Sequence, residues 1–268
     1  MTFLIGTRGS KLSLAQTNWV ISELQKQNPD SEFEIKTITT KGDTDTRALF
    51  TIDQRGIFEK EIDKAVADKQ VDFAVHSLKD VPSDIPDSLT IASIPKREPA
   101  NDVIITKDGS NLRTIQSKSV IGTSSLRRAV QVSRVRPDVL VKPVRGNIET
   151  RINKVMDGKF DAIILAQAGI SRLGSDVKHS ALSTKDFPPS PGQGALAIIC
   201  RADDDKTISM LKKIEDKKSR TEIEAEREIS EYVESGCRFP VGALAIANSD
   251  MLKPVSYTHL TLPTNREV

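Results

Sequence analysis

The fold is decided by the stretch VDFAVHSLKD at residues 71–80. Its first five residues are apolar apart from one aspartate, which is typical of a strand buried inside a sheet. Polar and charged side chains follow at once, from His76 to Asp80. Ligands bind at the carboxyl ends of the strands in open α/β sheets. The stretch therefore predicts a buried strand that presents Lys79 and Asp80 to a ligand site.

Around this stretch, strand patterns alternate with helix patterns, which indicates α/β units with mainly parallel sheets. Phe3–Thr7 and Phe33–Thr39 have the character of strands. Between them, the capping box Ser13-x-x-Gln16 predicts the start of a helix that ends at Asn28-Pro29.

The chain also contains a weak internal repeat. Residues 55–75 and 145–164 share the order Arg-Gly, helix, aspartate and buried strand, with a slip of one residue. Two similar lobes with a ligand cleft between them explain the repeat most simply, and chance similarity between two βαβ units is the alternative. Residues 95–101 and 188–194 are rich in Pro or Gly, so we expect the chain to cross between the lobes there through hinges.

These features predict a domain plan. Lobe 1 comprises residues 1–97 and 195–216, and lobe 2 comprises residues 98–194. A partial C-terminal domain follows at 217–254 and begins with a charged helix. We interpret residues 255–268 as the translation of a cloning or adapter sequence and exclude them from the fold.

Composition narrows the class of protein. The 268 residues include 39 basic and 37 acidic side chains, so the net charge of +2 argues against attraction of the whole surface to nucleic acid or membrane. Two distant cysteines without CxxC spacing support neither a disulfide framework nor a zinc site. The N-terminus has no apolar stretch long enough for a signal peptide or a membrane span, and we expect a cytosolic protein.

Asp80 is the candidate catalytic group. A carboxylate at the floor of a cleft can hold a substrate N–H and stabilise a developing cation while it stays ionised, and Lys79 favours that state. A loop salt bridge is the alternative. Adjacent residues on a strand point to opposite faces, so we do not expect His76 and Ser77 to join in a Ser-His-Asp triad. We expect His76 to pack at the end of the strand.

Arginines gather where strands end or helices begin. The segment VIGTSSLRR at residues 120–128 combines a helix start with Ser124, Ser125 and two forked guanidiniums, which together favour a carboxylate or phosphate. Further cationic groups of this kind come from Arg8, Arg145, Arg151 and Arg172. A ligand with several carboxylates explains the set, whereas solvated charge is the alternative for any one of them.

Cys237 lies in the segment ESGCRFPVG at residues 234–242, where a thiol has no obvious packing role. A nucleophilic cysteine needs exposure and a nearby positive charge, and Arg238 supplies the charge. An incidental surface cysteine is the alternative. Cys200 lies inside an apolar run, and we expect it to be an inert core thiol.

Six segments together resemble the family of hydroxymethylbilane synthase, also called porphobilinogen deaminase. They are Thr7-Arg8-Gly9-Ser10, HSLKDVP at 76–82, GTSSLRR at 122–128, Arg145-Gly146-Asn147, PGQGA at 191–195 and Gly236-Cys237. The resemblance runs from about Ile5 to Gly242.

The resemblance implies an α/β fold with two lobes like periplasmic binding proteins and a small α+β third domain whose cysteine loop hangs into the cleft. It implies a cytoplasmic, monomeric transferase of porphyrin and heme biosynthesis that uses no metal. Such an enzyme joins four porphobilinogen molecules head to tail, loses ammonia at each addition, and releases hydroxymethylbilane by hydrolysis. The family's third domain continues well beyond Met251, so the resemblance also implies that this domain is truncated here.

Roles carry over from the family by position. Asp80 is the catalytic carboxylate, and Cys237 carries a dipyrromethane cofactor through a thioether. Cofactor binding falls to Ser77, Lys79, Asp80, Thr123, Ser125, Arg127, Arg128, Arg145 and Gly146. Substrate binding falls to Arg8, Ser10, Arg55, Arg145, Arg151, Arg172 and Gln193. Each porphobilinogen carries two carboxylates, so the growing product needs such a set of cations.

Two other classes of protein compete with this interpretation. A non-catalytic anion-binding protein would use the arginines but would leave Asp80 and Cys237 without a role. A nucleic-acid-binding protein is disfavoured because aromatic residues make up only 4% of the chain and are not interleaved with basic stretches.

Overall fold

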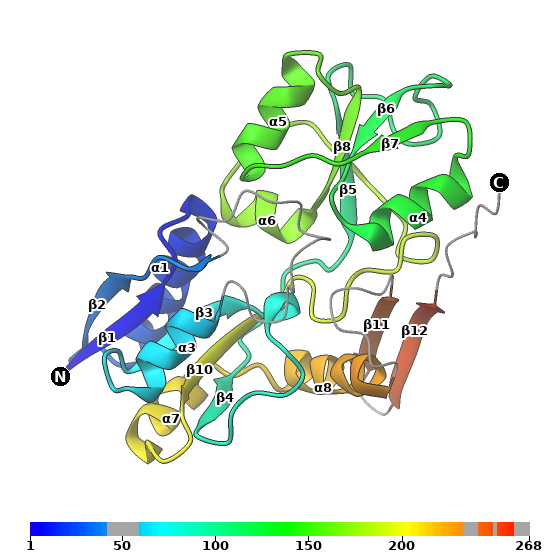
Figure 1. Ribbon diagram of the computed structural model, residues 1–268. Coiled ribbons are helices and arrows are strands. Elements are labelled where there is room, and N and C mark those ends of the chain that lie inside the picture. The colour runs from blue at the N-terminus through cyan, green and yellow to red at the C-terminus, as the bar shows by residue number, and fades with distance from the viewer. Residues whose placement is uncertain (42–58, 233–240, 249–250, 260–268) are drawn as a thin grey trace.

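The computed structural model describes residues 1–41, 59–232, 241–248 and 251–259 and places two five-stranded sheets in separate lobes (Figure 1). The first sheet has the order β2-β1-β3-β10-β4. Its strands are β1 (Thr2–Thr7), β2 (Glu32–Thr37), β3 (Phe73–Ser77), β4 (Leu89–Ser93) and β10 (Leu196–Arg201). The helices that contact it are α1 (Lys11–Gln27), α3 (Lys60–Ala67) and α7 (Asp205–Leu211).

The second sheet has the order β7-β6-β8-β5-β9. Its strands are β5 (Asp102–Thr106), β6 (Val120–Gly122), β7 (Leu140–Lys142), β8 (Ala162–Ala166) and β9 (Ser180–Ala181). Its helices are α4 (Leu126–Val135), α5 (Ile148–Met156) and α6 (Gln167–Arg172). Short 3-10 turns occur at η2 (Leu78–Asp80) and η3 (Lys212–Ile214). In the part of the chain that the structure describes, no helix has the length and apolar character needed to cross a membrane.

The two lobes have the same topology, which confirms the prediction of two similar α/β lobes. In each lobe, the third strand in the order of the sheet, β3 or β8, follows a helix in the chain. The fourth strand, β10 or β5, comes from a distant part of the chain. The aspartates of the repeat make equivalent hydrogen bonds. Asp72 Oδ2 accepts from the Leu4 N–H at 2.7 Å, and Asp161 Oδ2 accepts from the Val120 N–H at 2.6 Å. Each carboxylate thus joins the start of β3 or β8 to the neighbouring strand, β1 or β6.

The sheets are mixed: four strands of each sheet run in the same direction, as expected, and the fifth runs the opposite way. Strand β1 runs parallel to β2 and β3, and β6 runs parallel to β7 and β8. Strands β10 and β5 are antiparallel to both of their neighbours. Each of these two strands enters its sheet from the opposite lobe and not from a crossover helix, and the crossover helix is the connection that favours parallel pairing.

The chain crosses between the lobes twice, after β4 and before β10. The two crossings lie side by side, because the Glu98 N–H donates to Gly194 O at 3.1 Å and Gln193 Nε2 donates to Ala100 O at 2.7 Å. Gly194 has φ of +90°, and a Cβ at this position would lie 2.3 Å from Glu98 O. The absence of a side chain therefore permits the close approach of the crossings. Hinge motion at these segments stays a prediction.

Helix α1 begins earlier than its sequence pattern predicts. Its N-cap is Ser10, whose Oγ accepts from the Ser13 N–H at 3.2 Å, so the expected start at Ser13 is wrong. Two serines three residues apart offered the same capping chemistry, and the upstream serine caps the helix. The end at Asn28 is confirmed as the C-cap.

A third unit consists of α8 (Lys217–Tyr232) and the antiparallel pair β11 (Val241–Asn248) and β12 (Met251–His259). Glu226 on α8 is fully buried and joins this unit to both crossings. It pairs with Arg97 at 2.7 Å and accepts from the N–H groups of Gly192 and Ala245. Residues 255–259 are part of β12, and the origin proposed for the segment 255–268 stays a prediction.

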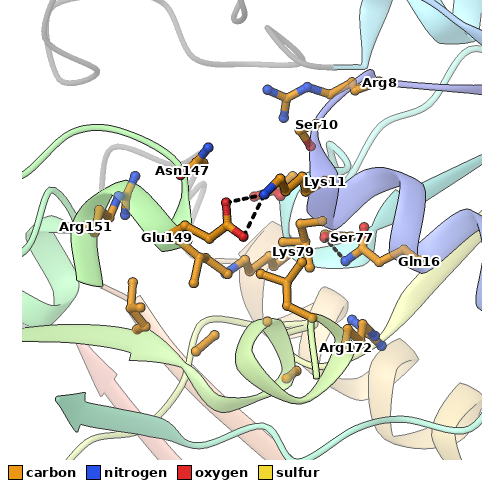
Figure 2. A pocket seen from close by; sticks show the side chains of 18 of the residues that line it. Arg8, Ser10, Lys11, Gln16, Ser77, Lys79, Asn147, Glu149, Arg151 and Arg172 are labelled. Carbon is orange, nitrogen blue, oxygen red and sulfur yellow. Dashed lines mark hydrogen bonds and ion pairs between the residues drawn. The ribbon is translucent and has the colours of Figure 1, made fainter. Parts of the chain in front are cut away.

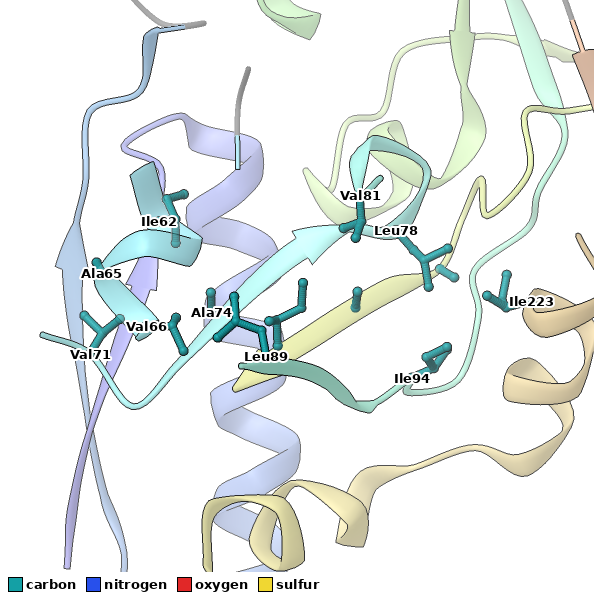
Figure 3. Close-up of a cluster of buried hydrophobic side chains, with 13 residues drawn as sticks. Ile62, Ala65, Val66, Val71, Ala74, Leu78, Val81, Leu89, Ile94 and Ile223 are labelled. Carbon is teal, nitrogen blue, oxygen red and sulfur yellow. The ribbon is translucent and has the colours of Figure 1, made fainter. Parts of the chain in front are cut away.

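The core of lobe 1 extends into this third unit. Figure 3 shows a cluster in which Ile62 and Val66 of α3 and Ala74 of β3 continue through Ile94 to Ile223 of α8. Ile223 is fully buried. The helix is therefore anchored by apolar packing as well as by Glu226.

Candidate functional site

A cavity of about 700 Å³ lies between the lobes. Residues of lobe 1 line it from the start of α1 and the end of β3, and residues of lobe 2 line it from the starts of α5 and α6 (Figure 2). These are strand ends and helix starts, where free backbone groups and polar side chains concentrate. The cavity is thus built from the positions where the sequence pattern predicted a ligand site.

The last residue of β3 and the turn that follows it supply Ser77, Lys79 and Asp80 to the cavity. Ser77 Oγ accepts from Gln16 Nε2 of α1 at 2.9 Å, which fixes its orientation. Burial lowers the pKa of Lys79, and the neighbouring carboxylate of Asp80 works against this shift. Asp80 itself is exposed. Its carboxylate is accessible to a ligand that enters between the lobes.

The approach of a crossing segment holds this turn in place. Gly192 has φ of +73°, and a Cβ there would lie 2.3 Å from Leu78 Cδ2 and 3.2 Å from the backbone nitrogen of Lys79. A larger residue would push against the turn that carries Lys79 and Asp80. The crossing and the candidate catalytic turn are therefore one packed unit.

Positive charge dominates the cavity. The described residues that line it include five arginines and two lysines against two carboxylates, those of Asp80 and Glu149. Burial lowers the pKa of Arg172 to about 10, and Glu98 opposes this shift. Burial also lowers the pKa of Arg151, and Arg128 and Arg145 add to the shift because like charges repel. Cations held this close together favour a ligand with several negative charges.

Several of these guanidiniums are oriented by backbone carbonyl groups. Arg151 Nε donates to Gly146 O at 2.7 Å, and Arg172 Nη2 donates to Gly194 O at 2.7 Å. Each bond uses one edge of the guanidinium and leaves other N–H groups for a ligand. Preorganisation of this kind lowers the entropic cost of binding.

Asp102 is a residue of the site that sequence reasoning missed. It is fully buried, and its Oδ1 accepts from Arg128 Nη2 at 2.7 Å and from Gln193 Nε2 at 2.8 Å. Its Oδ2 lies 2.9 Å from Arg127 Nη1. Burial favours the neutral acid, but Arg127 and Arg128 outweigh it and hold the pKa of Asp102 well below its usual range. Asp102 therefore compensates both guanidiniums behind the cavity.

Asp102→Asn should destabilise the protein strongly because it leaves two buried guanidiniums without a counter-charge. Removing one partner of a buried ion pair costs about 3–5 kcal/mol, and we expect a loss of this size in the free energy of unfolding measured by urea titration. Because the pKa of Asp102 is depressed, its contribution is fully present above the unfolded carboxyl pKa of about 3.9 and is lost as the pH falls through the folded value.

Asp138→Asn is the matched control for this measurement. Asp138 pairs with Arg136 at 2.7 Å on the surface, where ion pairs contribute little to stability. A loss for Asp102→Asn no larger than that for Asp138→Asn would show that Asp102 is not the counter-charge of the buried arginines.

The predicted site residues divide into two groups by position. Those that line the cavity are Arg8, Ser10, Ser77, Lys79, Asp80, Arg128, Arg145, Gly146, Arg151 and Arg172. Thr123, Ser125, Arg127 and Gln193 do not line it. Ser125 caps α4, and Thr123 Oγ1 accepts from the Ser125 N–H. The binding roles predicted for all of these residues stay predictions.

Arg127 and Gln193 are engaged within the protein. Arg127 Nη1 donates to Pro188 O at 2.8 Å, and Gln193 bonds Ala100 O and Asp102. These contacts give both residues a structural role at the crossings. Arg55 and Cys237 lie outside the residues that the structure describes.

Two further sequence predictions are confirmed. Cys200 is fully buried in β10, and burial raises the pKa of its thiol to about 12, so it is an inert core residue. His76 is 5% exposed and packs at the end of β3 with its Nε2 3.1 Å from Asp63 Oδ1.

A mixed α/β fold of two lobes with a cation-lined cavity between them defines a protein that binds a small, multiply anionic ligand. The chain belongs to the porphobilinogen deaminase family. A sequence model described as "Porphobilinogen deaminase, dipyromethane cofactor binding domain" matches residues 3–209.

Similar proteins carry the same family name. The chain is 71% identical to a "Probable porphobilinogen deaminase" of Nitrosopumilus maritimus over 248 residues, which is 92% of this chain and 80% of that protein. It is 45% identical over 243 residues to a "Porphobilinogen deaminase" of Brevibacillus brevis, which is 90% of this chain and 79% of that protein.

Solved structures with a similar arrangement include a putative methionine-binding lipoprotein from Bacillus subtilis, with a TM-score of 0.48 and 13% identity over 82% of this chain and 92% of that one. The effector-binding domain of BenM with benzoate has a TM-score of 0.45 and 14% identity over 87% of this chain and 93% of that one.

Proposed function

We infer that the chain has the activity of hydroxymethylbilane synthase. This transferase joins four porphobilinogen molecules head to tail with loss of ammonia and releases the linear product by hydrolysis. Its cofactor is dipyrromethane. The observation that carries the inference is the cavity in which five arginines, two lysines and the exposed Asp80 meet, in a chain that belongs to the porphobilinogen deaminase family.

The residues of the cavity fit a dipyrromethane group. Each pyrrole of this group carries an acetate and a propionate, and forked guanidiniums bind carboxylates through paired hydrogen bonds. A cavity of about 700 Å³ lies in the range of small-molecule sites. We propose that Lys79, Arg128 and Arg145 hold the cofactor and that Arg8, Arg151 and Arg172 hold the substrate. When bound, the dipyrromethane supplies the primer to which substrate is joined.

Asp80 has the catalytic role in this proposal. Loss of ammonia from porphobilinogen leaves an electron-poor methylene-pyrrole cation, which a nearby carboxylate stabilises. The same carboxylate can accept a hydrogen bond from a pyrrole N–H and so orient the substrate. The exposure of Asp80 at the cavity and its position next to Lys79 support this role.

Cys237 is the proposed attachment point of the cofactor. The described chain on its C-terminal side is anchored near the cavity, because the Ala243 N–H donates to Pro189 O at 2.9 Å. The crossing that contains Pro189 also contains Gly192, which packs against Lys79. These contacts support the proposed role of Cys237. We further propose that the protein is a cytoplasmic monomer, as the family resemblance implies, and that it acts without nucleic acid, membrane or metal.

An assay with porphobilinogen tests the proposed function. The purified protein should consume porphobilinogen, release ammonia and form a linear tetrapyrrole, and its absorbance should reveal a bound pyrrole chromophore. A protein that binds porphobilinogen but leaves it unchanged would instead be a non-catalytic anion-binding protein.

A further inference from the structure

One ion pair joins the lobes at the cavity. Lys11 Nζ of α1 lies 2.9 Å and 2.8 Å from the two carboxylate oxygens of Glu149, which lies in the first turn of α5 (Figure 2). Both residues line the cavity, one from lobe 1 and the other from lobe 2. The ammonium group of Lys11 therefore faces the same space as the arginines.

Glu149 is unexpected in a cavity that attracts anions. Asp80 has a catalytic role in the proposed function, whereas Glu149 has none and cancels one of the positive charges. Arg151 and Arg172 each use part of the guanidinium for a bond to a carbonyl oxygen and keep other N–H groups for a ligand. The compact charge of Lys11 is instead engaged by both oxygens of one carboxylate. Glu149 thus binds the ammonium group of Lys11 in the way that a carboxylate of a ligand would.

We propose that Lys11 is a further substrate-binding residue and that Glu149 occupies it until a carboxylate of porphobilinogen takes its place. The proposal rests on the proposed function of the cavity. The exchange replaces one carboxylate at Lys11 by another, so no charge is gained or lost at Lys11. It also breaks a bond between the lobes, so binding of substrate at Lys11 favours their separation.

The surroundings of both residues favour such an exchange. Their side chains are 70% and 50% exposed, and exposed ion pairs are weak enough for a ligand to compete with them. Lys11 is the first residue of α1, where the helix dipole disfavours a cation and favours an anion beside it. Glu149 lies in the first turn of α5, where the dipole of that helix stabilises its charge after release.

Binding of porphobilinogen to two variants tests the proposal without turnover. Lys11→Gln and Glu149→Gln would each be combined with Cys237→Ser and titrated with porphobilinogen by calorimetry. Lys11→Gln removes the cation and should weaken binding of porphobilinogen by about two- to fivefold. Glu149→Gln removes the competing carboxylate and should tighten binding by a similar factor. In the protein with Cys237 intact, KM for porphobilinogen should rise for Lys11→Gln and fall for Glu149→Gln.

The opposite directions of the two expected changes in affinity distinguish this proposal from a simpler one. If the pair only ties the lobes together, both variants remove the same bond and shift the affinity in the same direction, which overturns the proposal. Unchanged affinity in both variants overturns it as well. Asp157→Asn serves as the control, because Asp157 pairs with Lys159 on the surface of lobe 2 and does not line the cavity.

Failure of the proposed function has a different signature. A protein with Cys237 intact that fails to convert porphobilinogen refutes the proposed enzyme, whatever the two variants do. Variants that shift the affinity in the same direction, in a protein that does convert porphobilinogen, refute only the exchange at Lys11.

Discussion

Purified Cys237→Ser protein should weigh no more than its encoded amino acids and should form no tetrapyrrole. A thioether requires a thiolate nucleophile, and a serine hydroxyl at neutral pH is not ionised and is a weak nucleophile without an activating base. Without the tethered primer, no product can grow, so the expected loss of activity is complete. Intact-protein mass spectrometry and a porphobilinogen assay measure the two effects separately.

Cys200→Ala is the control for the mass measurement. Cys200 is buried in β10, and burial raises its thiol pKa to about 12, so it should not react with a pyrrole. Its alanine variant should keep the added mass. Added mass on Cys237→Ser that disappears from Cys200→Ala would move the attachment to the other cysteine.

Asp80→Asn should keep the covalent cofactor but turn over very slowly. Asparagine preserves the shape of the side chain and can still accept a hydrogen bond, but it has no charge to stabilise a methylene-pyrrole cation. Removing one preorganised electrostatic group of this kind costs about 10²–10³-fold in kcat. Because the charge on the cation develops during the reaction, kcat should fall much more than KM rises.

Asp87→Asn is the matched control, since Asp87 is exposed in the loop after Asp80 and does not line the cavity. It should have the kcat of the unsubstituted protein. Turnover by Asp80→Asn close to that of the control would remove Asp80 from the catalytic role.

Local patterns in the sequence predicted several of the helices and strands. A buried strand followed directly by a polar turn at residues 71–80 predicted that Lys79 and Asp80 face a ligand site, and both residues line the cavity. The internal repeat predicted two lobes, because each copy is a short segment with its own helix and strand. Such features depend on neighbours within a few residues, and the pattern of side chains records them directly.

Contacts between distant residues could not be predicted in this way. Strand β10 is buried along almost its whole length, so its hydrophobic pattern fits parallel and antiparallel pairing equally well. Asp102 follows an asparagine and resembles part of a turn, and its partners Arg127 and Arg128 are about two dozen residues away. The Lys11–Glu149 pair joins residues that are 138 positions apart. Only the folded chain brings these groups together.

The position of β10 between β3 and β4 has a consequence for how the protein is made on the ribosome. The nascent chain delivers β1 to β4 early, but the strand that joins β3 to β4 follows about a hundred residues later, after the whole second sheet. Until then, β3 and β4 each present an unpaired edge, which is the kind of surface that aggregates or recruits chaperones. The second sheet, whose strands are contiguous in the chain, can assemble first, so synthesis from the N-terminus does not set the order of folding.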